Sequence, residues 1–251
     1  EVWIAHLPDG PEHYDKRCYV SRVMTNATLG SAMVWDDMAY VFAAEAQDST
    51  GGRKLWMSCS RDMQAWSTPV KVFESPFGEI FNVAVTRDDS GVAFLWETNA
   101  LGVPFTMCMG RVEHPANNWN AGVLDEAVYG ENKYTGGPAL YYEAGWYYLL
   151  YLEALGGGRY ETRITRSRDM KVWMDAPDSR PFLTFDPSKN AMPLQRPEVT
   201  ETNASDAELC LHKGRTLVYF TGGNQLVAGD LQWASYEGTP EQLLECFFDK
   251  L

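Results

Sequence analysis

The sequence has few cysteines and histidines, and this shortage excludes several kinds of site. Its five cysteines lie far apart without a CxxC pair: Cys18, Cys59, Cys108, Cys210 and Cys246. A sparse, odd number predicts neither a disulfide framework nor a zinc site, and we expect small buried residues within strands. The four histidines also lack metal-ligand spacing. We therefore expect no metal and no cofactor.

Basic residues are scarce and long apolar runs are absent. The chain has 21 lysines and arginines against 34 aspartates and glutamates, which gives a net charge of -13. Such an acidic surface repels phosphate backbones, so we expect neutral substrates and no nucleic acid. Without a run of about 18 apolar residues, we also expect no membrane partner. The chain has no signal peptide and begins at Glu1 rather than Met, which indicates a mature form or a fragment.

The most informative stretch covers residues 136–173, GGPALYYEAGWYYLLYLEALGGGRYETRITRSRDMKVW. Its Tyr, Leu, Ile and Thr content and its glycine-marked turns predict three antiparallel strands, at Ala139–Tyr142, Trp146–Glu153 and Tyr160–Ser167. One such meander cannot bury both of its faces. It therefore needs neighbours of the same kind.

Similar segments recur along the chain with a fixed period. The repeat is marked by tryptophans 53 and 54 residues apart, Trp66, Trp119 and Trp173. It is also marked by glutamates 52 and 56 residues apart, Glu45, Glu97 and Glu153. A period near fifty with three or four short strands per repeat predicts a β-propeller. We expect the three tryptophans to occupy equivalent places and to be largely buried.

The predicted fold is one all-β domain over residues 1–251, a five-bladed β-propeller with an incomplete N-terminal blade. Trp3 lies one period before Trp56, so residues 1–25 form a partial blade. Either the first two strands of that blade are missing from the sequence, or the C-terminal segment supplies a substitute. Full blades are predicted at 26–75, 79–120, 136–181 and 203–251. A short helix is predicted to begin at Pro240 with Thr239 as its cap.

Hairpin geometry indicates where a site would lie. The start of the first strand and the end of the second share one edge of a hairpin, so these positions converge on one rim of a propeller channel. The rim residues from second strands are Glu45, Glu97, Glu153, Asn224 and Gln225. Those from first strands are Glu79, Asn82, Asn203, Asp206 and Glu208.

Asp206 is the strongest of these candidates. TNASDAEL aligns without a gap on TNATLGSA, which places Asn203 on Asn26 and Asp206 on Leu29. A carboxylate that stands where another repeat has leucine is not required by the fold. The recurring glutamates are weaker candidates, because a repeat inherits structural residues as readily as functional ones and loop acids are commonly solvated.

Several motifs resemble a known superfamily. SRDMQAW and SRDMKVW resemble the S-x-D-x-x-x-W blade ends of the five-bladed propeller glycoside hydrolases, which include arabinanases, β-xylosidases, invertases and levansucrases. GGPALYYEAGWYYLLY resembles the EGP hairpin of that superfamily, and sialidase Asp-boxes are similar to the SRDM motif too. We interpret Ser60, Asp62, Ser167 and Asp169 as structural, because turn residues of these types bond backbone amides.

The resemblance implies three acidic residues at the starts of inner strands: a general base, a general acid and a carboxylate that tunes the acid. The EGP glutamate falls on Gly136, which departs from the family pattern. If the partial blade is the family's first, Glu79 takes the acid position and the base belongs to strands outside this sequence. Our prediction is a monomeric glycoside hydrolase (glycosidase) that cleaves an oligo- or polysaccharide by carboxylate acid/base catalysis, with Asp206 and Glu79 as catalytic residues.

The remaining predicted site residues bind substrate: Asn203, Glu208, Glu45, Glu97, Glu153, Asn224, Gln225 and Trp35. Trp35, Trp96 and Trp146 offer rings for stacking on sugars, although tryptophan packs between blades at least as often. Two alternatives stay open. One is a non-catalytic carbohydrate-binding propeller that has lost its general acid, and the other is a scaffold for protein partners with an exposed apolar face. The resemblance favours a secreted or periplasmic protein.

Overall fold

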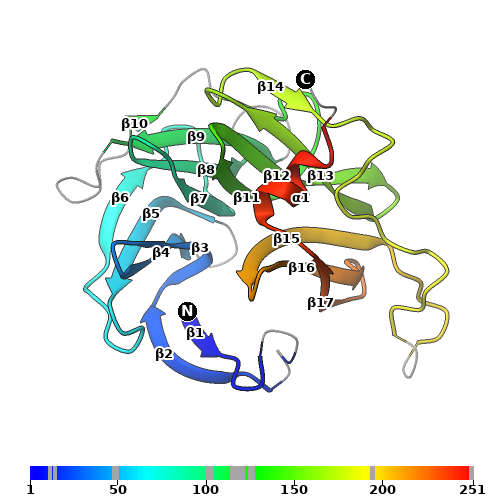
Figure 1. Cartoon of the computed structure of the whole chain (residues 1–251), viewed down its shortest axis with the longest axis horizontal. Coiled ribbons are helices and arrows are strands. Elements are labelled where there is room, and N and C mark those ends of the chain that lie inside the picture. The colour runs from blue at the N-terminus through cyan, green and yellow to red at the C-terminus, as the bar shows by residue number, and fades with distance from the viewer. Residues whose placement is uncertain are drawn as a thin grey trace. The chain divides into compact units, whose positions relative to one another are not determined.

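The computed structural model describes residues 1–10, 13, 16–46, 51–99, 105–113, 122–123, 128–192 and 196–248 (Figure 1). The chain divides into two compact units, Glu1–Glu126 and Ala127–Leu251. Both units are built from mainly antiparallel sheets of short strands. The predicted all-β class is confirmed, whereas the number of blades stays a prediction.

The first unit contains three separate sheets. A two-stranded sheet pairs β1 (Val2–His6) with β2 (Cys18–Met24). A four-stranded sheet follows in the order β3 (Ala27–Trp35), β4 (Met38–Ala46), β5 (Gly51–Ser60) and β6 (Val70–Glu74). A second four-stranded sheet consists of β7 (Val83–Arg87), β8 (Val92–Thr98), β9 (Thr106–Val112) and β10 (Gly122–Val123). Each strand pairs with its neighbours in sequence, as a meander requires.

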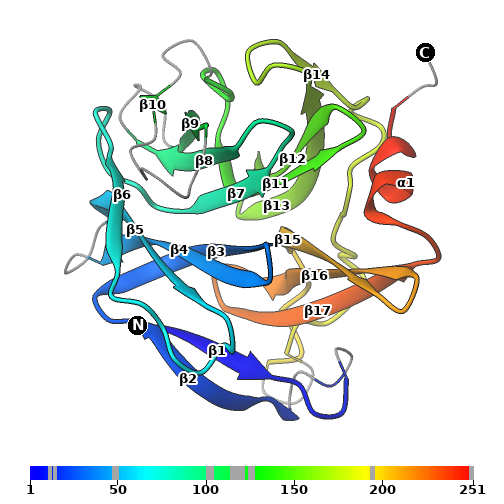
Figure 2. The same cartoon turned by 60° about the vertical axis from the view of Figure 1, so that its left-hand side comes forward.

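The second unit repeats this pattern twice. Its first group comprises β11 (Thr135–Glu143), β12 (Trp146–Gly156), β13 (Arg159–Ser167) and β14 (Trp173–Asp175). Its second group comprises β15 (Asn203–His212), β16 (Arg215–Asn224) and β17 (Ala228–Tyr236), drawn in orange in Figure 2. A short parallel pairing joins β13 to β15 at Tyr160 and Asn203, so the two groups form one seven-stranded sheet.

The strand groups can be placed against the predicted segments, whose assignment as blades stays a prediction. β3 to β6 lie within the predicted segment 26–75, and β15 to β17 lie within 203–251. β7 to β10 begin within the predicted segment 79–120 but extend to residue 123. β11 to β14 lie within 136–181, except that β11 begins one residue earlier, at Thr135. The helix α1 (Pro240–Glu245) begins where predicted. Thr239 and Gln242 form a capping box, which satisfies two amide groups that would otherwise lack a partner.

Each unit has its own apolar core. In the first unit Phe42 and Phe94 meet edge to face at 5.2 Å, and Phe73 lies 4.7 Å from the ring of Trp96. In the second unit buried residues of β12, β13 and β16 pack with Leu244 of α1. Burial of each large apolar side chain contributes about 1.5–3 kcal/mol to folding. The near-continuous burial of β8, β9 and the middle of β12 therefore has an energetic basis.

The repeat tryptophans and the cysteines are less buried than the sequence predicts. Trp66 and Trp173 both follow an SRDM turn, but each is only half-buried, and Trp119 lies outside the described residues. The Nε1 of Trp66 donates to Ser21 Oγ at 2.9 Å, and the ring of Trp173 packs on Tyr129.

Of the cysteines, Cys108 is buried and Cys59 is half-buried, whereas the other three are exposed: Cys18, Cys210 and Cys246.

Candidate functional site

Three inner strands carry the same irregularity. In β3, β11 and β15 the pairing register shifts after Thr28, Gly136 and Ser205 respectively, which marks a β-bulge. The residue that follows each of these has a left-handed backbone: Leu29 (φ 51°), Gly137 (φ 49°) and Asp206 (φ 55°). The alignment of Asp206 with Leu29 is therefore supported by the backbone. Bulges re-aim side chains and occur often beside active sites.

The bulge of β15 holds Asp206 in a defined position. Ser205 Oγ donates to Asp206 Oδ2 at 2.6 Å. The other carboxylate oxygen fills the space beside Gly137 on β11, where an added Cβ would lie 2.1 Å from Asp206 Oδ1. Glycine at this position is thus favoured by its left-handed backbone, and the carboxylate beside it leaves no room for a Cβ. The side chain of Asp206 remains exposed to solvent.

Replacement of Gly137 by alanine is expected to destabilise the protein and to displace Asp206. Gly156→Ala is the matched control, because Gly156 also has a left-handed backbone (φ 82°) but nothing lies within 4 Å of an added Cβ. The control should cost about 1–2 kcal/mol from backbone strain alone. Gly137→Ala should cost clearly more, as measured by urea unfolding. Equal losses in the two variants would show that Asp206 does not press on Gly137.

Glu208 lies two residues beyond Asp206 on β15, opposite Tyr219 of β16. The hydroxyl of Tyr141, on β11, donates to Glu208 Oε2 at 2.8 Å. Burial of the carboxyl group raises the pKa of Glu208 to about 7; the Tyr141 bond opposes this and the negative charge of Asp206 adds to it. Part of the side chain stays open to solvent. Glu208 is therefore a solvent-accessible acid that keeps its proton close to neutral pH.

Asp206 and Glu208 together provide two carboxyl groups with different tasks. Burial and the negative charge of Asp206 raise the pKa of Glu208, so Glu208 holds its proton close to neutral pH. Such a pair is able to supply a proton and to accept one at the same pH. Sequence reasoning assigned Glu208 to substrate binding and missed Tyr141. One tyrosine among several in an aromatic strand gives no signal of its own.

The other predicted residues of this edge of β15 and β16 have structural bonds. Asn203 is 1% exposed and its Nδ2 donates to the Thr221 carbonyl at 2.7 Å, which ties the two strands together. Asn224 Oδ1 accepts from the Leu226 amide at 3.2 Å, as in an Asx turn. Gln225 is exposed within that turn.

The recurring glutamates have partners inside their own sheets. Glu45 and Glu153 occupy the same place, opposite the first residues of β3 and β11. Glu45 lies 3.3 Å from Lys54 Nζ, and Glu97 accepts from Asn82 Nδ2 at 2.6 Å. These bonds give Glu45 and Glu97 a structural role. Their assignment to substrate binding stays a prediction.

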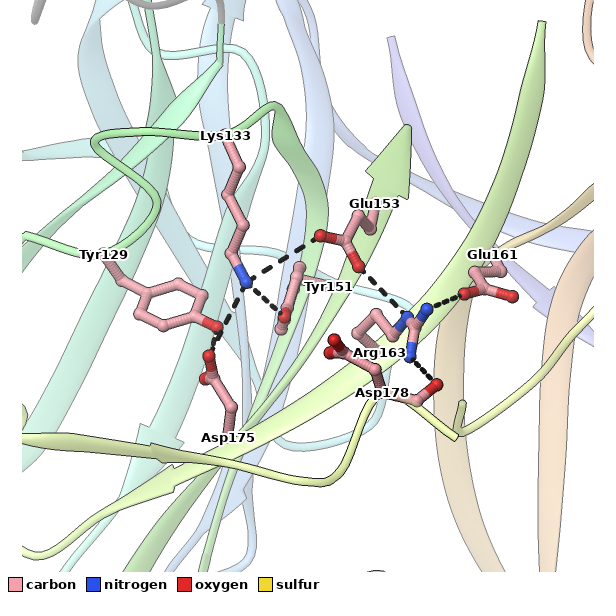
Figure 3. Close-up of polar contacts among 8 residues, drawn as sticks. All are labelled: Tyr129, Lys133, Tyr151, Glu153, Glu161, Arg163, Asp175 and Asp178. Atoms are coloured by element: carbon pink, nitrogen blue, oxygen red, sulfur yellow. Dashed lines mark hydrogen bonds and ion pairs between the residues drawn. The ribbon is translucent and has the colours of Figure 1, made fainter. Parts of the chain in front are cut away.

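Glu153 belongs to an ion-pair network that Figure 3 shows. Arg163 Nε lies 3.0 Å from Glu153 Oε2, and a second guanidinium nitrogen pairs with Glu161. Lys133 lies near Glu153 and Asp175 at 3.9 and 3.7 Å. Its ammonium group also contacts the Tyr151 hydroxyl at 2.8 Å. Two cations thus face three carboxylates, and we interpret the network as structural.

Replacement of Arg163 by methionine is expected to lower the free energy of unfolding by roughly 3–5 kcal/mol, because Glu161 loses its cation in a largely buried place and Glu153 keeps only Lys133. Glu161 is only 4% exposed, so water cannot replace the guanidinium. Lys54→Met is the control, since its pair with Glu45 is more exposed and should cost less than about 1 kcal/mol. Urea unfolding of both variants tests the difference. A loss of under 1 kcal/mol for Arg163→Met would contradict the structural interpretation.

The predicted general acid Glu79 belongs to the first unit. It is half-buried, and Asn99 Nδ2 lies 3.4 Å from its Oε2. Asp206 belongs to the second unit, so the pairing of Glu79 with Asp206 stays a prediction.

The tryptophans do not form the expected stacking surface at the strand starts. Trp35 lies at the turn between β3 and β4, at the opposite end of that hairpin from Glu45, with the Arg87 guanidinium 3.9 Å from its ring centre. Trp96 is completely buried. Trp146 begins β12 and is covered by Arg166 and Arg168, each about 4 Å from the ring. Substrate stacking at this edge by Trp35 is therefore not supported by its position.

The SRDM motifs have the structural role that their sequence predicts. Asp62 Oδ1 accepts from the amides of Gln64 and Ala65, each at 2.9 Å, and these bonds lower the pKa of Asp62. Asp169 repeats the arrangement with the amides of Lys171 and Val172. Both carboxylates are occupied by the turn itself. They are not available for chemistry.

Within the described ranges, no group of three His, Cys, Asp or Glu residues is placed to hold a metal ion. In the same part of the chain, no helix has the length and apolar character needed to cross a membrane.

Comparison with solved structures identifies the fold. A thermostable family-43 glycoside hydrolase aligns over 86% of this chain and 70% of its own, with a TM-score of 0.64 and 11% identity. The xylan β-1,4-xylosidase from Bacillus halodurans aligns over 88% and 44%, with a TM-score of 0.62 and 17% identity. The α-L-arabinofuranosidase from Lactobacillus brevis aligns over 90% and 79%, with a TM-score of 0.59 and 13% identity.

The resemblance to five-bladed β-propeller glycoside hydrolases is confirmed at the level of the fold. This chain spans less than half the length of the xylosidase, and also less than half the length of two other family-43 structures that it resembles. No protein-family model and no curated protein sequence matches it. At 10–17% identity the likeness concerns architecture, so activity has to be argued from the residues themselves.

Proposed function

We propose that the protein hydrolyses glycosidic bonds in an oligo- or polysaccharide, with Asp206 and Glu208 as its acid/base pair. The observation that carries this proposal is the bulge of β15. There an exposed carboxylate lies two residues from a carboxyl group whose pKa is raised to about 7. The likeness of fold to glycoside hydrolases supports the substrate class.

Each residue has one task in the proposed reaction. Glu208 gives its proton to the leaving glycosidic oxygen as the bond from that oxygen to the anomeric carbon breaks. Asp206 accepts a proton from the water whose oxygen attacks the same carbon. One water is consumed, and transfer of a proton from Asp206 through solvent to Glu208 restores the site.

We propose that the reaction inverts the configuration at the anomeric carbon. Inverting enzymes separate their two carboxyl groups by about 6.5 to 9.5 Å, which leaves room for the attacking water. The prediction of Glu79 as the general acid is replaced in this proposal by Glu208, which lies on the same strand as Asp206. The first product should therefore have the opposite anomeric configuration to the substrate, which proton NMR detects.

The experiment is an activity screen on aryl glycosides and on plant and algal polysaccharides. The expected result is sugar release by the wild-type protein and release that is slower by about a hundredfold or more by Asp206→Asn on the same substrate. Release that is equal in the two proteins would contradict the proposed pair.

A second candidate function is carbohydrate binding without hydrolysis. It is favoured by Gly136, which is buried and has no side chain where the family's general acid is expected. This function predicts saturable binding of an oligosaccharide by calorimetry with no product from any member of the panel. Measurable turnover that depends on Glu208 would exclude it.

A further inference from the structure

Tyr141 connects two strands at the proposed site. It lies on β11, and its hydroxyl reaches Glu208 on β15, where it donates to Oε2 at 2.8 Å. The same hydroxyl oxygen accepts a bond from the Leu209 amide at 2.7 Å. The hydroxyl thus has one donor partner and one acceptor partner. This arrangement leaves it no freedom to rotate.

The direction of these bonds follows from the number of protons. The Leu209 amide is only a donor, so the tyrosine oxygen must accept from it. The single hydroxyl proton then points to Glu208 Oε2, and that oxygen acts as an acceptor. A protonated Glu208 therefore carries its own proton on Oε1. Oε1 is the oxygen that remains for a bond to a leaving group.

We propose that Tyr141 is a positioning residue that fixes the Glu208 carboxyl group and makes Oε1 the oxygen that delivers the proton. The inference rests on the proposed function of Glu208 as the acid. It explains why a tyrosine with a largely buried hydroxyl is bonded to a carboxyl group that the reaction needs in its protonated form. A merely structural tyrosine would not select one of the two carboxyl oxygens.

The charged and titratable groups around this pair set the sign of its pH effect. Asp206 and Cys210 come from β15, Tyr141 comes from β11, and Tyr219 lies across from Glu208 on β16. Burial, followed by the charge of Glu208, keeps the pKa of Tyr141 well above its usual value, so it stays a donor. Its bond favours ionised Glu208. Removal of the hydroxyl should therefore raise the pKa of Glu208 further.

The test is Tyr141→Phe, studied by carbon-13 NMR titration of the side-chain carboxyl groups in glutamate-labelled protein. The Glu208 signal is assigned by its loss in Glu208→Gln. The expected result is an upward shift of the Glu208 midpoint by about one pH unit, since bonds to charged groups contribute about 1.5–3 kcal/mol. On an active substrate, the upper limit of the pH range for kcat/KM should move up with it.

Tyr148→Phe is the matched control. Tyr148 is also buried and its hydroxyl also bonds a carboxylate, but that carboxylate is Glu245 of α1. The control should lose stability and leave the Glu208 midpoint unchanged. If Tyr141→Phe does not fold, 3-fluorotyrosine placed at position 141 keeps the shape, strengthens the donor and should lower the midpoint.

The titration separates this inference from the proposed function, because it needs no substrate. A raised midpoint in a protein that hydrolyses nothing supports the positioning role and rejects the hydrolase. Hydrolysis with a midpoint that does not move in Tyr141→Phe overturns the positioning role. An equal shift in Tyr148→Phe also overturns it.

Discussion

Asp206→Asn is expected to reduce hydrolysis by about a hundredfold to ten-thousandfold, the usual contribution of a general base. Asparagine keeps the shape of the side chain and accepts the left-handed backbone that Asp206 has. The Ser205 hydroxyl can still donate to the amide oxygen. Only the charge and the ability to accept a proton are lost. The free energy of unfolding should therefore change by less than about 1 kcal/mol.

The control for this variant is Asp37→Asn. Asp37 is also an exposed aspartate with a left-handed backbone (φ 59°), at the turn between β3 and β4. Its replacement should change neither turnover nor stability. Initial rates on one aryl glycoside and urea unfolding of both variants make the comparison. Full hydrolysis by Asp206→Asn would remove Asp206 from the reaction.

Glu208→Gln is expected to lower kcat/KM by about a hundredfold or more and to abolish its pH dependence near neutrality. In the wild type, burial raises the pKa of Glu208 to about 7, so the proton donor is lost as the pH rises through that value. Rates should fall about tenfold for each further pH unit. A profile of kcat/KM from pH 5 to 9 measures this. A wild-type rate that is constant from pH 6 to 9 would contradict the role of Glu208.

The same pKa has a consequence for stability. Because the pKa of Glu208 is higher in the folded protein than its ordinary value of 4.5, the folded state binds the proton more tightly. The contribution of Glu208 is therefore fully present below pH 4.5 and is lost as the pH rises through about 7. The difference in unfolding free energy between wild type and Glu208→Gln should shift against the wild type between pH 5 and pH 8. Urea unfolding at both values tests the sign.

Much of the fold was predictable because it depends on local patterns. Aromatic and β-branched strands separated by glycine turns give the meanders, and a period near fifty gives their repetition. Pro240 and Thr239 identified the helix start for the same reason, since a capping box is a local motif. Asp206 was found because a gapless alignment compares equivalent backbone positions. The bulge that it shares with Leu29 shows why that comparison worked.

The rest depends on contacts between strands that no local pattern encodes. The Tyr141 and Glu208 side chains meet from β11 and β15, which are 67 residues apart at this point. The glutamates at strand ends were predicted as a set, but Glu45 and Glu153 are paired by cations of neighbouring strands. The alignment of repeats did not distinguish a glutamate that pairs with a cation from a glutamate that is open to solvent. Trp35 was predicted beside the glutamates but lies at the turn between β3 and β4, at the other end of the hairpin. The length of the hairpin decides this position, and the residue type does not reveal it.

The measurement that tests the central claim most directly is a double-mutant cycle on Asp206 and Glu208. The kcat/KM values of Asp206→Asn, Glu208→Gln and the double variant are compared with the wild type on one aryl glycoside. Residues that act as a unit show strongly non-additive losses. The predicted result is that the double variant is no slower than the slower single variant. Losses that multiply in the double variant, or a single variant that keeps the wild-type rate, would contradict the claim that the two carboxyl groups form one acid/base pair.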